Sequence, residues 1–191
     1  MKKMSSLFLS LILTLPTLAF AKGNGYHQAQ HEKVQAHRTQ QHQENKEFRG
    51  SLRNSGLSKE EKNKAVMEHR ETQHKENTEF RDSMHQENMD HMKEKLDKNE
   101  KLSDEQKQEL LNFRENQYQE NVKFSDQQHQ ENMQVLDQIL NDPNLTPEQK
   151  KAKLKENHFI QKEERQDHYK TQHSENKEER EKIKSEVQAA K

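Results

Sequence analysis

Apolar and polar side chains recur along this chain with a period of eleven residues. The unit reads His-x-Glu-Asn-x-x-Phe-Arg, and its clearest copies begin at His42, His74, His85, Tyr118, His129 and His173. The units form blocks, and the blocks that begin near Asn63, Lys107 and Lys151 start 44 residues apart. Eleven residues complete three turns of an α-helix at about 3.67 residues per turn. The repeat therefore predicts long helices in an eleven-residue coiled coil that runs nearly straight.

Three short segments between the blocks combine residues that end a helix with residues that begin one. Turn-forming residues precede Ser58, Ser103 and Thr146, and Glu or Gln follows each of these three residues at the third position. This is the spacing of a capping box. Pro147 takes a first helical position, where its missing N–H has no effect. We predict four helices, over about 27–52, 58–96, 103–140 and 146–189.

These elements predict an all-α fold. Short connections make consecutive helices antiparallel neighbours, and a helix of 39 residues is about 58 Å long at about 1.5 Å per residue. We expect residues 22–191 to form a single repetitive domain of elongated helical hairpins.

The face that these helices bury is unusually polar. If His42 and its equivalents are position 1, then positions 1, 4, 7, 8 and 11 share a stripe about 120° wide. Position 7 is often Phe, position 4 is Asn in many units, and position 1 is mostly His. A buried polar group without a partner costs about 1–3 kcal/mol. These Asn and His side chains must hydrogen-bond across the seam or stay hydrated, and we expect a wet, loosely packed seam, completed by dimerisation or by binding.

The first 21 residues resemble an export signal. Lys2 and Lys3 precede an apolar run from Leu7 to Phe20, and Ala19 and Ala21 are small residues at the positions that a signal peptidase recognises. A membrane anchor needs about 18 to 20 apolar residues, more than this run offers. We expect cleavage after Ala21, with release of a protein without a membrane segment into a bacterial periplasm.

Composition narrows the range of functions. The chain is 26% hydrophobic and 35% charged, with no Cys and four Gly, which excludes disulfides and cysteine-zinc sites and leaves little for phosphate-binding loops. Its 33 Lys and Arg balance 34 Asp and Glu, so we expect no nucleic-acid partner. General acid–base catalysis needs carboxylates in a pocket, and a polar helix offers none; we expect no enzymatic activity.

Twelve His and seven Met make metal binding an alternative. His27 and His31 share a helical face at spacing i, i+4, and could bind Zn, Cu or Ni. A second candidate cluster contains His85, Met89, His91 and Met92, in which His85, Met89 and Met92 share a face. The competing interpretation is that the methionines are the apolar stripe of this block, and that the His residues are copies of a duplicated unit.

The helix starts Leu102-Ser-Asp-Glu-Gln106 and Leu145-Thr-Pro-Glu-Gln149 resemble the LTxxQ motif of the Spy/CpxP group of periplasmic stress proteins. Leu57-Ser-Lys-Glu-Glu61 departs from the motif in its last residue. The resemblance implies a helical, non-catalytic stress-response protein that acts as an ATP-independent chaperone or envelope accessory, with metal-responsive relatives.

Three functions follow. The chain could bind unfolded or envelope proteins on its polar-seamed amphipathic face, as a chaperone does, with a homodimer as one way to build that face. It could instead buffer metal ions through His and Met. A structural helical spacer is the third alternative.

Overall fold

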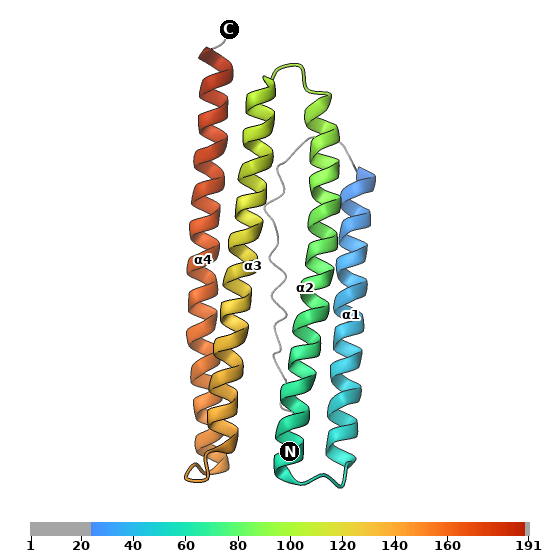
Figure 1. Cartoon of the computed structure of the whole chain (residues 1–191), viewed down its shortest axis with the longest axis vertical. Helices are drawn as coiled ribbons and strands as arrows, with labels where there is room; N and C mark the ends of the chain where they lie inside the picture. The colour runs from blue at the N-terminus through green and yellow to red at the C-terminus, as the bar shows by residue number, and fades with distance from the viewer. Residues whose placement is uncertain (1–23, 190–191) are drawn as a thin grey trace. The chain divides into compact units, whose positions relative to one another are not determined.

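The computed structural model describes residues 24–189, which contain four α-helices and no strand. They are α1 (Asn24–Asn54), α2 (Lys59–Asp97), α3 (Asp104–Asn141) and α4 (Pro147–Ala189) (Figure 1). The predicted all-α fold is confirmed, and every predicted helix end lies within about three residues of the observed end, an ordinary difference for helix boundaries. The signal-peptide prediction for residues 1–21 lies outside the described residues.

Hydroxyl side chains cap the last three helices, as the spacing predicts. At the start of α3, the Ser103 side chain accepts a hydrogen bond from the Gln106 backbone N–H at 3.2 Å. The Gln106 side chain accepts one from the Ser103 backbone N–H at 3.1 Å. The same reciprocal pair forms between Ser58 and Glu61 and between Thr146 and Gln149. These pairs satisfy backbone N–H groups that have no partner within the helix.

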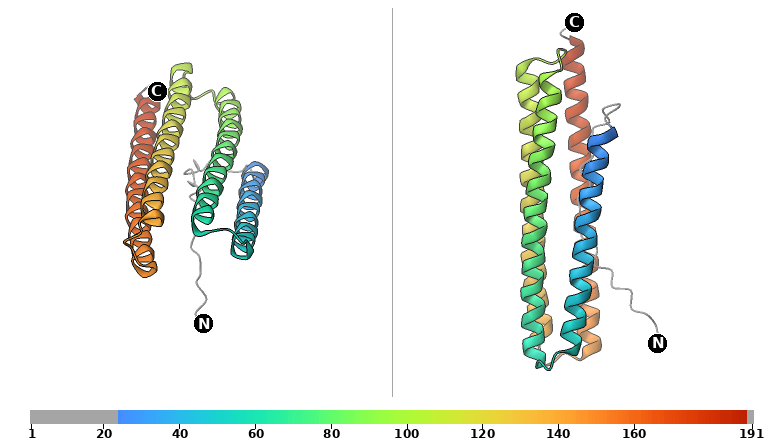
Figure 2. Two further views of the ribbon diagram at one scale, coloured as in Figure 1. Left: turned by 60° about the horizontal axis from the view of Figure 1, so that its bottom comes forward. Right: turned by 90° about the vertical axis from the view of Figure 1, so that its right-hand side faces the viewer.

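The chain divides into two compact units at Ser55–Gly56, with α1 in the first and α2, α3 and α4 in the second. Within the second unit, α3 is the middle helix and packs against both α2 and α4. Successive helices of this unit run in opposite directions (Figure 1 and Figure 2). The antiparallel hairpins predicted for α2–α3 and for α3–α4 are therefore confirmed.

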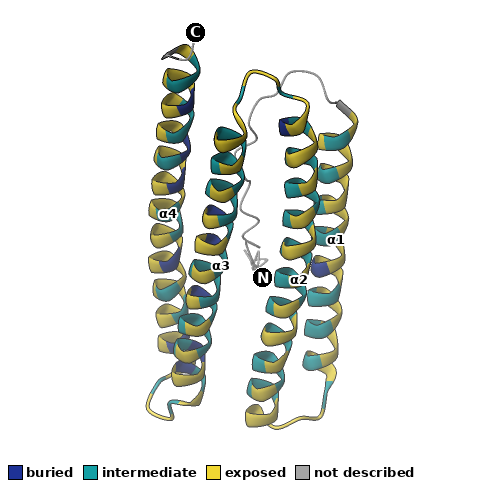
Figure 3. Cartoon of the chain, turned by 45° about the horizontal axis from the view of Figure 1, so that its top comes forward, coloured by how far each residue is buried: buried dark blue, intermediate teal, exposed yellow. Residues whose placement is uncertain are grey.

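Few apolar side chains are buried. Among the described residues, the buried hydrophobic side chains are Leu96, Leu136, Ile139 and Ile183. Glutamine and asparagine are buried as deeply in α3 and α4, at Gln117, Asn121, Gln128, Gln161, Gln172 and Asn176. The buried positions of α4 follow the side of the helix that faces α3 (Figure 3). The contact between these two helices is therefore largely one of amide side chains.

Helix α1 is stabilised by contacts along its own surface. Gln28 donates to Glu32 at 2.9 Å and Gln40 donates to Glu44 at 2.8 Å, both at spacing i, i+4. Such pairs stabilise an isolated helix by about 0.2–0.5 kcal/mol each.

Of the four described helices, none is long and apolar enough to cross a membrane.

Candidate functional site

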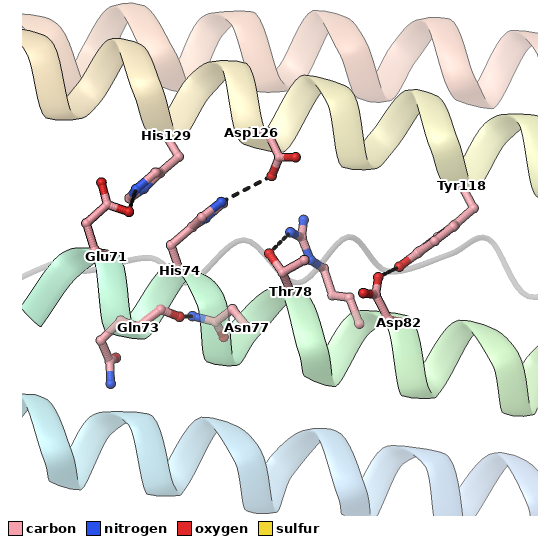
Figure 4. A network of polar contacts seen from close by, with 10 residues as sticks. Glu71, Gln73, His74, Asn77, Thr78, Asp82, Tyr118, Asp126 and His129 are labelled. Atoms are coloured by element: carbon pink, nitrogen blue, oxygen red, sulfur yellow. Dashed lines mark hydrogen bonds and ion pairs between the residues drawn. The ribbon is translucent and has the colours of Figure 1, made fainter.

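Paired rings hold α2 against α3, and we call this contact the ring seam. The imidazoles of His74 and His129 stack with centroids 3.8 Å apart and planes within 4° (Figure 4). His74 Nε2 lies 3.1 Å from Asp126 Oδ1, and His129 Nε2 lies 3.1 Å from Glu71 Oε2. Each ring thus stacks on the ring of the other helix. Each also bonds a carboxylate of the other helix, three residues before the ring on which it stacks.

The ring seam repeats this arrangement eleven residues further along α2. The rings of His85 and Tyr118 stack with centroids 3.6 Å apart and planes within 3°. His85 Nε2 lies 2.8 Å from Glu115 Oε2, and the Tyr118 hydroxyl donates to Asp82 (Figure 4 shows the second bond). Both carboxylates again lie three residues before the facing ring, so the contacts between α2 and α3 follow the eleven-residue unit.

Burial and neighbouring charge shift the pKa of groups in the ring seam. Burial lowers the pKa of His74, and the nearby His129 lowers it further, although the Asp126 carboxylate acts in the opposite direction. The hydrogen bond from His85 lowers the pKa of Glu115. Burial, together with the Asp82 carboxylate, raises the pKa of Tyr118. The seam therefore favours neutral His74 and Tyr118 beside ionised Glu115.

Glutamines hold α3 against α4, and we call this contact the amide seam. Gln161 Nε2 donates to the backbone carbonyl of Gln128 at 3.3 Å. Gln117 Nε2 makes the equivalent contact with the backbone carbonyl of Gln172 at 3.5 Å. All four glutamines are buried and occupy position 11 of the unit, directly before position 1. Each pair brings two antiparallel units into register.

The best-connected part of the amide seam surrounds Asn121. Its side-chain oxygen lies 2.7 Å from His168 Nε2, and its Nδ2 donates to Gln172 Oε1 at 3.2 Å. Gln172 Nε2 in turn donates to Glu120 at 2.9 Å. The His168 ring also stacks on Phe124, with centroids 4.1 Å apart, and burial lowers its pKa. These bonds satisfy groups that would otherwise be costly to bury.

The asparagine of the unit also bonds within its own helix. Its side-chain nitrogen donates to the backbone carbonyl four residues earlier at 2.7 Å, in the pairs Asn45–Gln41, Asn77–Gln73, Asn88–Met84 and Asn176–Gln172. This back-bonding is a usual way to satisfy a polar side chain within a helix. The asparagine at position 4 therefore has a structural role both in α1 and in the compact part formed by α2, α3 and α4.

The contacts of α2, α3 and α4 correct two expectations. The seam was expected to be wet, but its Gln, Asn and His side chains bond each other across the helices because the antiparallel register brings complementary groups together. Positions 1 and 11 were expected to share one buried stripe. On α3 they instead serve two partners, since Tyr118 and His129 face α2 whereas Gln117 and Gln128 face α4.

Sequence reasoning did not single out the glutamine of position 11. The signal was available, because Gln directly precedes the first residue of the unit in five of its six clearest copies, at Gln41, Gln73, Gln117, Gln128 and Gln172. Glutamine is mostly exposed in proteins, so a search for apolar core positions passes over it.

The predicted metal ligands lie in separate places along the chain. His27 and His31 are exposed on α1, and the His27 ring lies edge-on to Tyr26. On α2, His85 bonds Glu115 through Nε2. The other three predicted ligands of this cluster, Met89, His91 and Met92, are half-buried. Within residues 24–189, no three His, Cys, Asp or Glu side chains are grouped so that they could hold a metal ion. Metal binding through His and Met stays a prediction.

Large apolar side chains are exposed on α4. The exposed fractions are 58% for Phe159, 47% for Ile160 and 48% for Tyr169. Phe159 and Ile160 occupy positions 9 and 10 of the unit, where every other copy carries polar residues or glycine, for example Asp82-Ser83 and Asp126-Gln127. We call Phe159 and Ile160 the outer patch; Tyr169 lies nine residues after Ile160, about two and a half turns along α4, and so is on the opposite side of the helix from Ile160. Phe159 and Ile160 depart from the repeat, and this departure is visible in the sequence.

Comparison with known proteins identifies no relative of this chain. No family model, curated protein or solved structure matches the chain. The resemblance to the Spy/CpxP group therefore depends on the two helix-start motifs alone.

Proposed function

We propose that this protein is an exported, non-catalytic binding protein that holds partly folded or envelope proteins on the outer patch of α4. One observation carries the proposal: Phe159 and Ile160 are exposed at two positions where the other copies of the unit carry polar residues or glycine. Exposed apolar groups of this kind mark interaction sites when they gather on one surface.

The seams of α2, α3 and α4 are poor candidates for the same role. Their rings and amides already bond each other, as in the pairs His74–Asp126 and Gln161–Gln128. A client that used these groups would first have to separate two helices and leave buried polar atoms without partners. The outer patch needs no such rearrangement, which favours it as the binding surface.

The chemistry of the chain favours binding without ATP. Four glycines leave little from which to build a phosphate-binding loop. An aromatic and a branched aliphatic side chain are suitable anchors for apolar segments of an unfolded client. A patch of two side chains supports weak, reversible binding rather than a permanent complex. The export signal and the LTxxQ resemblance add support for a role in the cell envelope.

Aggregation of an unfolding model client, followed by light scattering without ATP, tests this proposal. The double variant Phe159→Glu/Ile160→Gln restores the polar character of the repeat at positions 9 and 10. We expect it to need about ten times more protein for equal suppression, equivalent to about 1.4 kcal/mol of binding free energy. The control is Leu57→Gln, which removes another exposed apolar side chain, outside the four helices; it should suppress aggregation as the parent protein does.

Two results would count against the proposal. Absence of suppression by the parent protein at stoichiometric amounts would remove a chaperone-like role and favour the structural spacer. Equal suppression by the double variant, with unchanged helicity and thermal melting, would place client binding on another face.

A further inference from the structure

We propose that Arg114 on α3 and Arg180 on α4 form an anion site that takes a phosphate group, either free or carried on a small molecule. Both arginines are half-buried. Arg180 lies twenty residues after Ile160, about 30 Å along α4. The site is therefore separate from the outer patch, and the inference does not depend on the proposed function.

The two guanidinium groups approach each other at the contact between α3 and α4. Arg114 Nη1 donates to Asn176 Oδ1 on α4 at 3.1 Å. Arg180 follows Asn176 by four residues, so it lies one turn further along the same face of α4. Side chains of an α-helix lean toward its N-terminus. Because α3 and α4 are antiparallel, Arg114 and Arg180 lean toward each other.

Positive charge is concentrated at this place. Burial lowers the pKa of Arg114, and the charge of Arg180 lowers it further. Residues three, four, seven or eight positions apart share a helix face. At these distances from Arg114 and from Arg180 the sequence has no acidic residue, whereas Lys107, Lys177 and Lys184 are among the neighbours. The helix faces that carry the two arginines are therefore not balanced by carboxylates of their own helices.

The carboxylates that lie near the two arginines in the sequence are used elsewhere. They bond in the pairs Glu109–Lys182, Glu115–His85, Glu175–Gln172 and Glu181–Lys184. Glu179 is the direct neighbour of Arg180, but its buried Oε1 and the buried Nε of Arg180 both lack a hydrogen-bond partner within residues 24–189. These two side chains therefore do not bond each other.

Arg180 is not used in the fold. Among the described contacts, no hydrogen bond or ion pair involves its guanidinium group. A charged group that is taken out of water without a counter-charge is costly, and the cost is larger beside a second positive charge. A bound anion would supply the missing charge and accept from the N–H groups of Arg180.

The repeat places two arginines together at one level of this contact. Arg114 and Arg180 both occupy position 8 of the unit. The other residues at position 8 of α3 and α4 are Ser125, Leu136, Pro147, His158 and Tyr169. The arginine pair is therefore a local feature of this level and not a consequence of the repeat.

A phosphate group suits this pair better than a carboxylate does. Two guanidinium groups carry two positive charges, and a phosphate group carries a charge of about −1.5 to −2 near pH 7, whereas a carboxylate carries one negative charge. The planar guanidinium group presents its N–H donors in pairs that match phosphate oxygens. Such a site uses side chains and needs no glycine-rich loop.

Titration with inorganic phosphate at constant ionic strength, followed by phosphorus NMR, tests the inference. We expect the parent protein to bind one phosphate per chain, and Arg180→Gln to bind it at least tenfold more weakly. Acetate, followed by its methyl signal, should bind the parent protein at least tenfold more weakly than phosphate does. The matched control is Arg165→Gln, which removes the other arginine of α4, bonded to Gln128 Oε1 at 3.4 Å; it should bind phosphate as the parent protein does.

Thermal melting separates a binding role of Arg180 from a structural one. In phosphate-free buffer, Arg180→Gln should melt at the same temperature as the parent protein or higher, because it removes a repulsive charge and no hydrogen bond. Phosphate should raise the melting temperature of the parent protein and leave that of Arg180→Gln unchanged.

Four results would overturn the inference. The parent protein could show no saturable binding of phosphate, or Arg165→Gln could lose as much binding as Arg180→Gln, which would show a general charge effect. Arg180→Gln could melt at a lower temperature than the parent protein without phosphate, which would give Arg180 a structural role. Binding of acetate as tight as that of phosphate would show a carboxylate site instead.

Discussion

His74 on α2 and His129 on α3 stack face to face, with ring centroids 3.8 Å apart, and each bonds the carboxylate that lies three residues before the other. The same relation joins His85 and Tyr118. The two helices are antiparallel and share one eleven-residue unit. The contact therefore recurs eleven residues later on α2 and eleven residues earlier on α3. The ring seam therefore aligns the repeats of the two helices through polar aromatic groups.

A double-mutant cycle on His74 and His129 tests this coupling. Aromatic pairs contribute about 0.5–1.5 kcal/mol beyond the area that they bury. We expect His74→Ala and His129→Ala each to lower the free energy of unfolding in urea, and the double variant to lose less than the sum. Strict additivity would show that the two rings do not interact in solution.

Stability should fall as the solution becomes acidic. The pKa values of His74 and His168 are lowered by burial, so the unfolded chain takes up protons at these residues before the folded protein does. Their contribution is present above the unfolded pKa of about 6.5 and is lost as the pH falls below it. Urea unfolding between about pH 8 and pH 5 measures this slope.

The control for the pH dependence is a pair of variants. His74→Gln/His168→Gln should make the slope between about pH 7 and pH 5 shallower, whereas His173→Gln, at an exposed position of α4, should not change it. A slope that stays the same in the double variant would assign the acid sensitivity to other groups.

Removal of one buried amide should destabilise the α3–α4 contact. Gln172 donates to Glu120 and accepts from Asn121, so Gln172→Ala leaves both groups short of a partner. We expect a loss of about 1–3 kcal/mol in the free energy of unfolding. Gln166→Ala, at an exposed position of the same helix, should change it by less than about 0.5 kcal/mol. Equal values for the two variants would contradict a bonded amide seam.

The capping boxes give a smaller, local prediction. Ser103→Ala removes the side chain that accepts from the Gln106 backbone N–H, and we expect a loss of about 1 kcal/mol by thermal or urea unfolding. Ser83→Ala, at an exposed position within α2, should be neutral or slightly stabilising because alanine favours the helix. Destabilisation by Ser83→Ala alone would be inconsistent with this account.

Much of the fold could be predicted from the sequence because local rules determine it. The spacing of Ser103 and Gln106 predicts where α3 begins, and an eleven-residue period predicts long straight helices. The partners of each helix face could not be predicted in the same way. A polar stripe does not show whether one helix or two will cover it, and α3 divides its stripe between the rings that meet α2 and the amides that meet α4.

The contacts of the candidate site between helices were likewise not predictable from the sequence. His85, Met89 and Met92 share a helix face by spacing alone, but spacing does not show that Glu115 from α3 bonds His85. Phe159 and Ile160 were detectable, since they interrupt the repeat at two polar positions. A pattern that the units share does not point to these two residues, because they lie where one unit differs from the others.

Under the proposed function, partners bind α4 at the outer patch and leave the amide seam closed. Three isoleucines lie in the described helices: Ile160 is 47% exposed on the outer patch, whereas Ile139 and Ile183 are buried at 7% and 9%. Methyl-labelled isoleucine therefore gives one NMR reporter on the patch and two in the core. On titration with an unfolded client, we predict that the Ile160 methyl signal shifts or broadens while those of Ile139 and Ile183 stay in place. Client binding that leaves Ile160 unchanged, or that perturbs Ile139 and Ile183 instead, would contradict the proposed function.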